Sequence, residues 1–145
     1  MMRWFTAQEL SEKQIAGPCL DVLKLRGWYA VRVLCGRFWT LDKRRVVSGP
    51  PKGTPDYLCV HPEHPGFFLE TKRPRGKLGA EQIFQIRAIQ QGYRVACIII
   101  DSPHQLTEFL ARWEKGEWAA TELTATALKQ NAKKSQSKAI IHKVL

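Results

Sequence analysis

Two short apolar segments joined by a turn are the feature that most constrains the fold of this chain. Tyr57–Val60 and Phe67–Leu69 have the length and composition of strands. His61–Gly66 between them holds two prolines and one glycine, which are typical of a turn. We therefore expect an antiparallel pair of strands. Its open end is charged, because Asp56 precedes the first strand and Glu70 follows the apolar part of the second.

The register of this pair decides where the charged side chains lie. Pairing Leu58 with Phe68 places Asp56 opposite Glu70, and Lys72 follows on the same face because side chains alternate along a strand. Carboxylates directly opposed across a sheet repel each other, so their presence favours a cation between them. The alternative is a solvated hairpin end with ordinary charged residues. We would favour that alternative for an isolated pattern of this kind, but the flanking sequence reverses the preference.

Two carboxylates and a lysine at one place suit the binding of a hard divalent cation and the handling of a phosphodiester. Oxygen ligands favour Mg²⁺ or Mn²⁺ over Zn²⁺. Such a cation polarises a phosphate and lowers the pKa of water. The ordinary lysine pKa of about 10.4 would have to fall by several units for Lys72 to act as a base near pH 7. We therefore expect Lys72 mainly to position groups and to stabilise charge.

Composition indicates one globular domain without a membrane span. The chain has 145 residues, of which 44% are hydrophobic, and this is enough for a single core. No apolar run approaches the roughly 20 residues of a membrane helix, and Met1–Trp4 lacks the apolar core of a signal peptide. The four cysteines form no Cys-x-x-Cys pair. We expect reduced, mostly buried thiols in a cytoplasmic protein.

The chain carries a formal net charge of +10, and many of its basic residues are grouped near the two carboxylates. Such an excess favours a polyanion such as DNA, because the cations would hold phosphates near a bound metal ion. The alternative is a generally basic surface without a specific partner. The residues that we expect to contact DNA are Lys43, Arg44, Arg45, Lys52, Arg73, Arg75 and Lys77.

Trp39 lies shortly before the basic run Lys43–Arg45. An exposed tryptophan beside cations can stack on an unpaired base. Packing against a strand or in the core is the interpretation that we favour for this residue.

The first half of the chain predicts a helix, a strand and a hairpin. A capping box at Thr6–Glu9 is expected to open a helix that runs to about Arg26, with a kink or break at Gly17-Pro18. A strand is expected over about 28–34. Residues 35–52 are expected to form an irregular hairpin with arms at 38–40 and 45–47.

The second half predicts a crossover to a parallel strand. A helix over about 80–91, closed by Gly92, separates the Glu70 strand from a nearly all-apolar strand at 94–100. Ser102 followed by Pro103 is expected to begin the last helix of the domain. The expected fold class is therefore α/β, a mixed sheet flanked by helices in the order αβββαβα.

The last stretch, residues 124–145, differs in composition from residues 1–123. It holds five lysines and no acidic residue. We interpret it as a basic tail, while a helix that contacts DNA and a dimerisation segment are the alternatives.

Several of these residues together resemble a known family. Gly53-Thr54-Pro55-Asp56, Glu70-Thr71-Lys72-Arg73-Pro74 and Gln82 resemble the VRR-NUC domain, a branch of the PD-(D/E)xK nuclease superfamily. The resemblance covers roughly residues 6–115, and a stand-alone domain of this size resembles the phage-type members. It implies a restriction-endonuclease-like core and a DNA phosphodiesterase that depends on Mg²⁺ or Mn²⁺.

The resemblance also implies roles for single residues. Asp56, Glu70 and the main-chain carbonyl of Thr71 would be metal ligands, and Glu12 matches a helical acid that completes a second metal site. Lys72 would orient or activate the attacking water, and Gln82 matches a glutamine that lies beside the site. The expected position of Glu12 depends on how the helix passes Gly17-Pro18.

Four functions are compatible with this resemblance and with the residues. We expect a structure-specific endonuclease similar to the Holliday-junction resolvases, acting as a homodimer on branched DNA. A flap or nicking endonuclease of the same fold is one alternative, and a non-catalytic DNA-binding module is another. A restriction-type enzyme is disfavoured, because the sequence offers no added region for recognition.

Overall fold

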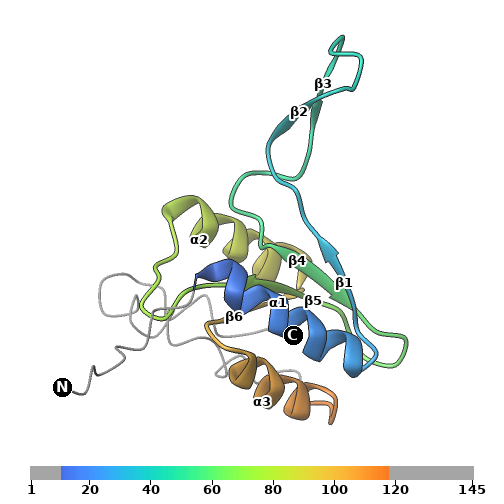
Figure 1. Cartoon of the computed structure of the whole chain (residues 1–145), viewed down its shortest axis with the longest axis vertical. Coiled ribbons are helices and arrows are strands. Elements are labelled where there is room, and N and C mark those ends of the chain that lie inside the picture. Colours follow the sequence, from blue (N-terminus) through green and yellow to red (C-terminus); the bar gives the residue numbers. More distant parts are fainter. Residues whose placement is uncertain (1–10, 118–145) are drawn as a thin grey trace, which may run out of the picture.

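The computed structural model describes residues 11–117, which form one mixed sheet with helices on both faces and a projecting hairpin (Figure 1). The elements are α1 (Glu12–Leu25), β1 (Tyr29–Arg32), β2 (Arg37–Trp39), β3 (Val46–Ser48), β4 (Tyr57–Val60), β5 (Phe67–Thr71), α2 (Ala80–Arg87), the π-helical turn η1 (Ala88–Tyr93), β6 (Ala96–Ile100) and α3 (Pro103–Trp113). This arrangement confirms the expected class, a mixed sheet flanked by helices.

The main sheet has the strand order β1-β4-β5-β6. The strands β1, β4 and β5 pair antiparallel, and β6 runs parallel to β5 as the crossover predicted. Leu58 lies opposite Phe68, so the register expected from the sequence is confirmed. The hairpin β2–β3 forms a separate two-stranded sheet that projects from the body (Figure 1).

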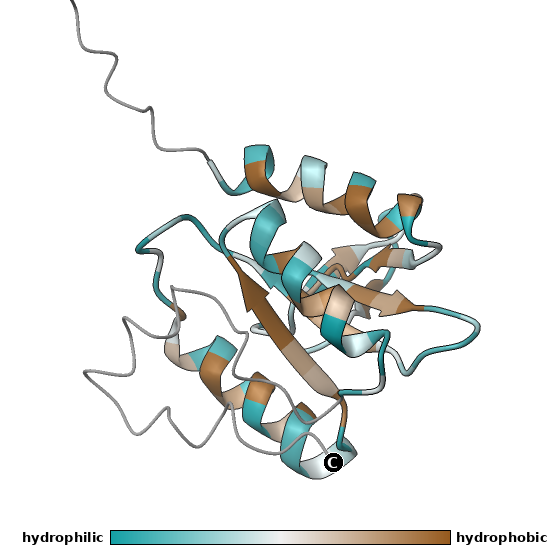
Figure 2. Cartoon of the chain, turned by 90° about the horizontal axis from the view of Figure 1, so that it is seen from below, coloured by the Kyte–Doolittle hydropathy of each residue, from teal (hydrophilic) through white to brown (hydrophobic). Residues whose placement is uncertain are grey.

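Each face of the main sheet has its own hydrophobic cluster. The larger cluster lies between the sheet and the helices α1 and α3, and the smaller one lies under α2 and η1. Hydrophilic residues (teal) and hydrophobic residues (brown) alternate along the helices in Figure 2, as expected for helices that pack one side on a sheet. The larger cluster includes Ile15, Cys19, Leu23, Trp28, Tyr57, Cys59, Phe67, Leu69, Ile98, Ile100, Phe109, Leu110 and Trp113.

The start of the first helix differs from the prediction. Ser11 is the N-cap of α1 and forms a capping box with Gln14, whereas Thr6–Glu9 lies outside the described residues. The expected break at Pro18 is wrong, because α1 continues through it. Ile15 and Cys19 are both buried beside Pro18. The free energy of this packing offsets the loss of the backbone hydrogen bond that proline cannot make.

The helix before β6 also ends differently from the prediction. Its α-helical part stops at Arg87, and the π-helical turn η1 follows in place of an end at Gly92. Arg94 takes the left-handed conformation that we expected of glycine, with φ of 56°. The wider turn keeps Ile89 and Gln90 buried while Tyr93 stays 79% exposed.

The remaining elements agree with the sequence. All residues of β6 are buried, and Ser102 caps α3 with Pro103 as its first residue. No helix in residues 11–117 has the length and apolar character to cross a membrane. The four cysteines are free thiols, of which three are buried and Cys35 is half-buried. The predicted boundary at 123/124 and the basic tail lie outside the described residues.

Candidate active site

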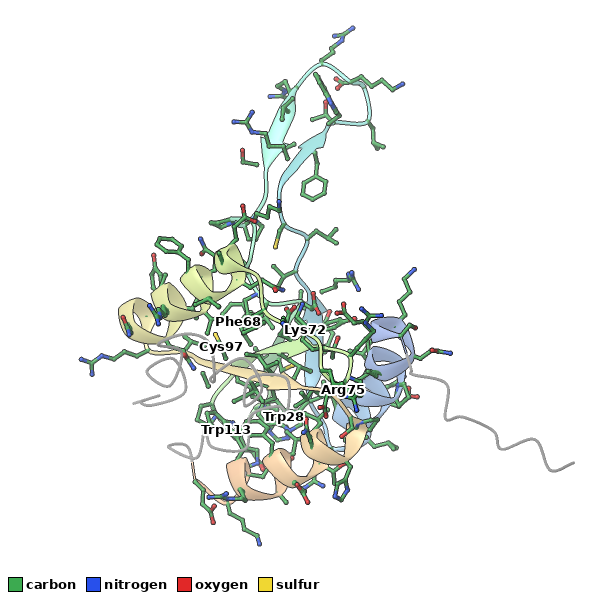
Figure 3. All side chains as sticks on the ribbon, turned by 90° about the vertical axis from the view of Figure 1, so that its left-hand side faces the viewer. Trp28, Phe68, Lys72, Arg75, Cys97 and Trp113 are labelled. Atoms are coloured by element: carbon green, nitrogen blue, oxygen red, sulfur yellow. The ribbon has the colours of Figure 1, made fainter. Side chains whose placement is uncertain are left out.

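The candidate site lies at one end of the main sheet, where β4 begins and β5 ends. Asp56 directly precedes β4, and Glu70 and Thr71 are the last residues of β5. The Lys72 N–H donates to the Ile100 carbonyl at 2.8 Å and so extends the pairing with β6 by one residue. Figure 3 shows Lys72 beneath the projecting hairpin. The strand ends therefore bring the predicted residues together.

The two carboxylates are linked through the backbone that carries them. The Asp56 N–H donates to Oε2 of Glu70 at 3.0 Å. In return, the N–H and the hydroxyl of Thr71 each donate to Oδ2 of Asp56 at 3.4 Å. Asp56 and Glu70 are thus held side by side, as the predicted register required.

Glu70 is the most buried charged residue of the site, with only 3% of its surface exposed. Its Oε1 accepts a hydrogen bond from Nε2 of Gln82 at 2.7 Å and lies 3.4 Å from Nζ of Lys72. Burial, and after it the negative charge of Asp56, raise the pKa of Glu70 to about 7 although Lys72 lowers it. Since the net direction is upward, Lys72 does not offset the combined effect of burial and of the Asp56 charge on the pKa of Glu70.

Gln82 is positioned by the first turn of α2. Its Oε1 accepts the N–H of Gly79 at 2.9 Å, so the same side chain caps the helix and donates to Glu70. The loop before Asp56 packs directly on this turn. Gly53 has a φ of +96°, and a Cβ there would lie 2.9 Å from the backbone nitrogen of Gln82 and would overlap the carbonyl of Glu81. Glycine is therefore required at this close approach.

Glu12 also reaches the site. It is the first residue of α1, and its Oε1 lies 3.8 Å from Nζ of Lys72. The Ser11 cap fixes where the helix begins and thereby directs Glu12 towards the end of the sheet. Lys72, which is 9% exposed, thus lies between a buried and a half-exposed carboxylate.

The donor atoms fit a hard divalent cation better than a soft one. Asp56 and Glu70 supply carboxylate oxygens, and the Thr71 carbonyl belongs to the same strand end. Within residues 11–117 there is no metal-binding cluster of three or more His, Cys, Asp or Glu side chains. A metal ion would therefore depend on the two carboxylates and on oxygens of backbone, water or substrate. Lys72 would have to share Glu70 with it.

The predicted DNA-contacting residues are all exposed but form separate groups. Lys43, Arg44 and Arg45 lie at the outer end of the hairpin, while Arg73, Arg75 and Lys77 lie in the loop between β5 and α2. Lys52 lies at the base of the hairpin, with Nζ 3.3 Å from Oε2 of Glu81.

Two features of this region were missed from the sequence. Asp101 follows β6 at the same end of the sheet and is only 8% exposed, and an acid directly after an all-apolar strand was the available signal. The interpretation of Trp39 as a packed residue is wrong, since it is 67% exposed on the hairpin. A two-stranded hairpin that stands away from the sheet has no core in which to bury it.

Comparison of the chain with protein-family models, with curated proteins and with solved structures gave no match. The resemblance to the VRR-NUC domain therefore stays a prediction.

Proposed function

We propose that the protein is a Mg²⁺- or Mn²⁺-dependent deoxyribonuclease of the PD-(D/E)xK type. The observation that carries this proposal is the convergence of Asp56, Glu70, Lys72 and Gln82 at one end of the sheet, connected by contacts of 2.7–3.4 Å. A folded protein seldom buries a carboxylate beside a second one unless a cation or a reaction uses the pair.

Some side chains of the site would bind the metal ion, and the others position these ligands or stabilise charge. Asp56 and Glu70, with the Thr71 carbonyl, would hold the metal ion, which when bound supplies charge to polarise the phosphate and to acidify water. Gln82 keeps Glu70 oriented through its 2.7 Å hydrogen bond. Lys72 contributes a positive charge beside the reacting phosphate. Glu12 steadies Lys72 from the other side.

Branched DNA is the substrate class that we propose, with four-way junctions first and flaps or nicks as the alternative. The described residues form one sheet with its helices and a hairpin, and they include no separate domain that could read several base pairs. The exposed cations contact phosphates and carry no sequence information. A homodimer that cuts two strands symmetrically would suit such a junction.

A non-catalytic DNA-binding module is a second candidate, and one contact favours it. Lys72 lies 3.4 Å from Glu70 and partly neutralises it without a metal ion. A protein with such a site could keep its fold and its basic surface and bind DNA without cleaving it.

Cleavage assays on four-way, flap and linear duplex DNA separate these candidates. The nuclease should cut the branched substrates in Mg²⁺ or Mn²⁺ and should be inactive in EDTA. Asp56→Ala should lose at least about 100-fold in rate while still binding DNA, because the exposed cations are intact. Glu63→Ala is the matched control, since this exposed acid lies in the turn at the opposite end of the β4–β5 pair. Full activity of Asp56→Ala would refute the assignment, and an inactive wild type that binds DNA would establish the second candidate.

A further inference from the structure

The hairpin β2–β3 leaves the body from the same end of the sheet as the candidate site. The N–H of Val33 donates to the Asp56 carbonyl at 2.7 Å, and the N–H of Gly36 donates to the Pro50 carbonyl at 3.2 Å. The excursion that carries the hairpin therefore begins and ends next to Asp56. We call residues 37–48 the arm, and Figure 1 shows it projecting from this end.

The arm exposes hydrophobic side chains on both of its faces. Phe38 pairs with Val47 and Trp39 pairs with Val46, so one pair lies on each face. Phe38 is 41% and Trp39 67% exposed. An isolated two-stranded hairpin is marginally stable in water, and one with exposed aromatic residues on it is suited to packing against something else.

The outer end of the arm is basic and has a defined conformation. Residues 37–48 contain four cations and one acid, so their formal charge is 4 − 1 = +3. The acid, Asp42, accepts hydrogen bonds from the Thr40 hydroxyl and from the Arg44 N–H. Both hydrogen bonds lower the pKa of Asp42, the one from Thr40 most. Lys43 is held in the left-handed conformation with φ of 56°, so its charge is presented by a structured turn.

We propose that the arm binds unpaired nucleotides next to the candidate site, with Trp39 stacked on a base and Lys43, Arg44 and Arg45 on the adjoining phosphates. Exposed aromatic rings beside cations are the combination that single-stranded nucleic acid requires. Duplex DNA offers its phosphates but not the faces of its bases. The net positive charge selects this partner over a second copy of the chain, whose arm would repel it. Only the use of the arm in cleavage depends on the proposed nuclease function.

The direct test measures binding in EDTA, where no metal-dependent cleavage takes place. Fluorescence anisotropy compares a forked DNA with unpaired tails and a blunt duplex of equal length. Trp39→Ala should weaken binding of the fork about 5- to 150-fold and change duplex binding by less than about 2-fold. Trp39→Phe should recover most of the loss because it keeps a ring that can stack.

Tyr29→Ala is the matched control. Tyr29 is 69% exposed, as Trp39 is 67%, but it lies at the other end of β1, where it pairs with Val60. This variant should bind both DNAs as the wild type does. Equal losses in Trp39→Ala and Tyr29→Ala, or an equal loss on fork and duplex in Trp39→Ala, would overturn the proposal.

Lys43→Gly tests the charge without disturbing the turn, because glycine accepts a positive φ readily. The variant should keep or raise the melting temperature. The slope of log affinity against log salt on single-stranded DNA should become shallower by about 0.7, the value for one phosphate contact. An unchanged slope would mean that Lys43 contacts no phosphate and would contradict the proposal.

Two further results keep the proposals apart. If Trp39→Ala turned a dimer into a monomer in sedimentation without changing fork binding, the arm would be an interface between copies and the proposal would be wrong. If the wild type cut no DNA but Trp39→Ala still weakened binding of the fork, the proposal for the arm would be supported and the proposed nuclease function would be refuted.

Discussion

Replacing Glu70 with glutamine tests the electrostatics of the candidate site, because it removes a buried charge and keeps the size of the side chain. Burial and the neighbouring Asp56 raise the pKa of Glu70 from 4.5 to about 7. The folded protein therefore holds this proton more tightly than the unfolded chain does. The resulting stability is fully present below pH 4.5 and is lost as the pH rises through about 7.

The size of the effect follows from the same values. The step from 4.5 to about 7 corresponds to about 3 kcal/mol once both states are ionised. Between pH 5 and pH 8 the wild type should lose about 2.5 kcal/mol of unfolding free energy through this group alone. Glu70→Gln cannot titrate, so it should lose none of it. An amide places an NH2 group where Oε2 of Glu70 accepts the Asp56 N–H, and the loss of this hydrogen bond costs the variant about 1–3 kcal/mol at every pH.

Urea unfolding in EDTA at several pH values measures the difference between the two proteins. The unfolding free energy of Glu70→Gln minus that of wild type should increase by about 2.5 kcal/mol from pH 5 to pH 8. Glu63→Gln, an exposed acid at the far turn, should show a constant difference. Saturating Mg²⁺ should stabilise the wild type more at pH 8 than at pH 5. A difference between Glu70→Gln and wild type that does not change with pH would refute the reasoning.

Two further predictions concern the backbone. Gly53→Ala and Gly36→Ala both put a side chain at positive φ, which costs about 1–3 kcal/mol. Only Gly53 lies against α2, so its variant should be less stable than Gly36→Ala by roughly a further 1–3 kcal/mol in urea unfolding, and equal losses would contradict the close approach. Pro18→Ala should stabilise the protein by about 2 kcal/mol, because alanine restores a hydrogen bond in the middle of α1. Thermal unfolding would test this, and a lower melting temperature would contradict it.

The strand pair around the site could be predicted because several local signals agree there. The turn residues limit the register of β4 and β5, and a shift by one residue would move Phe67 and Leu69 from the buried face to the other. The placement of Asp56 beside Glu70 then follows from the alternation of side chains along the two strands. The parallel position of β6 was predictable from its continuous apolar run and from the length of the preceding helix.

The features that the sequence did not predict depend on contacts between distant segments. Pro18 stays within a helix because Ile15 and Cys19 are buried against the sheet, and a local rule does not include that energy. The π-helical turn η1 connects α2 to β6 and keeps Ile89 buried. Trp39 was misjudged because residue type alone does not say whether a hairpin lies on the body or stands away from it.

The distribution of the four thiols makes the base of the arm accessible to chemistry without mutagenesis. Burial raises the pKa of Cys19 to about 11 and that of Cys59 and Cys97 to about 12, so these three rarely form the reactive thiolate. Cys35 is half-buried and lies between β1 and β2, with Sγ 3.6 Å from the Thr54 carbonyl. A maleimide dye at neutral pH should therefore label the natural chain at one position, Cys35, whose sulfur lies beside Thr54, two residues before Asp56. Its emission could follow the approach of a nucleic acid in real time.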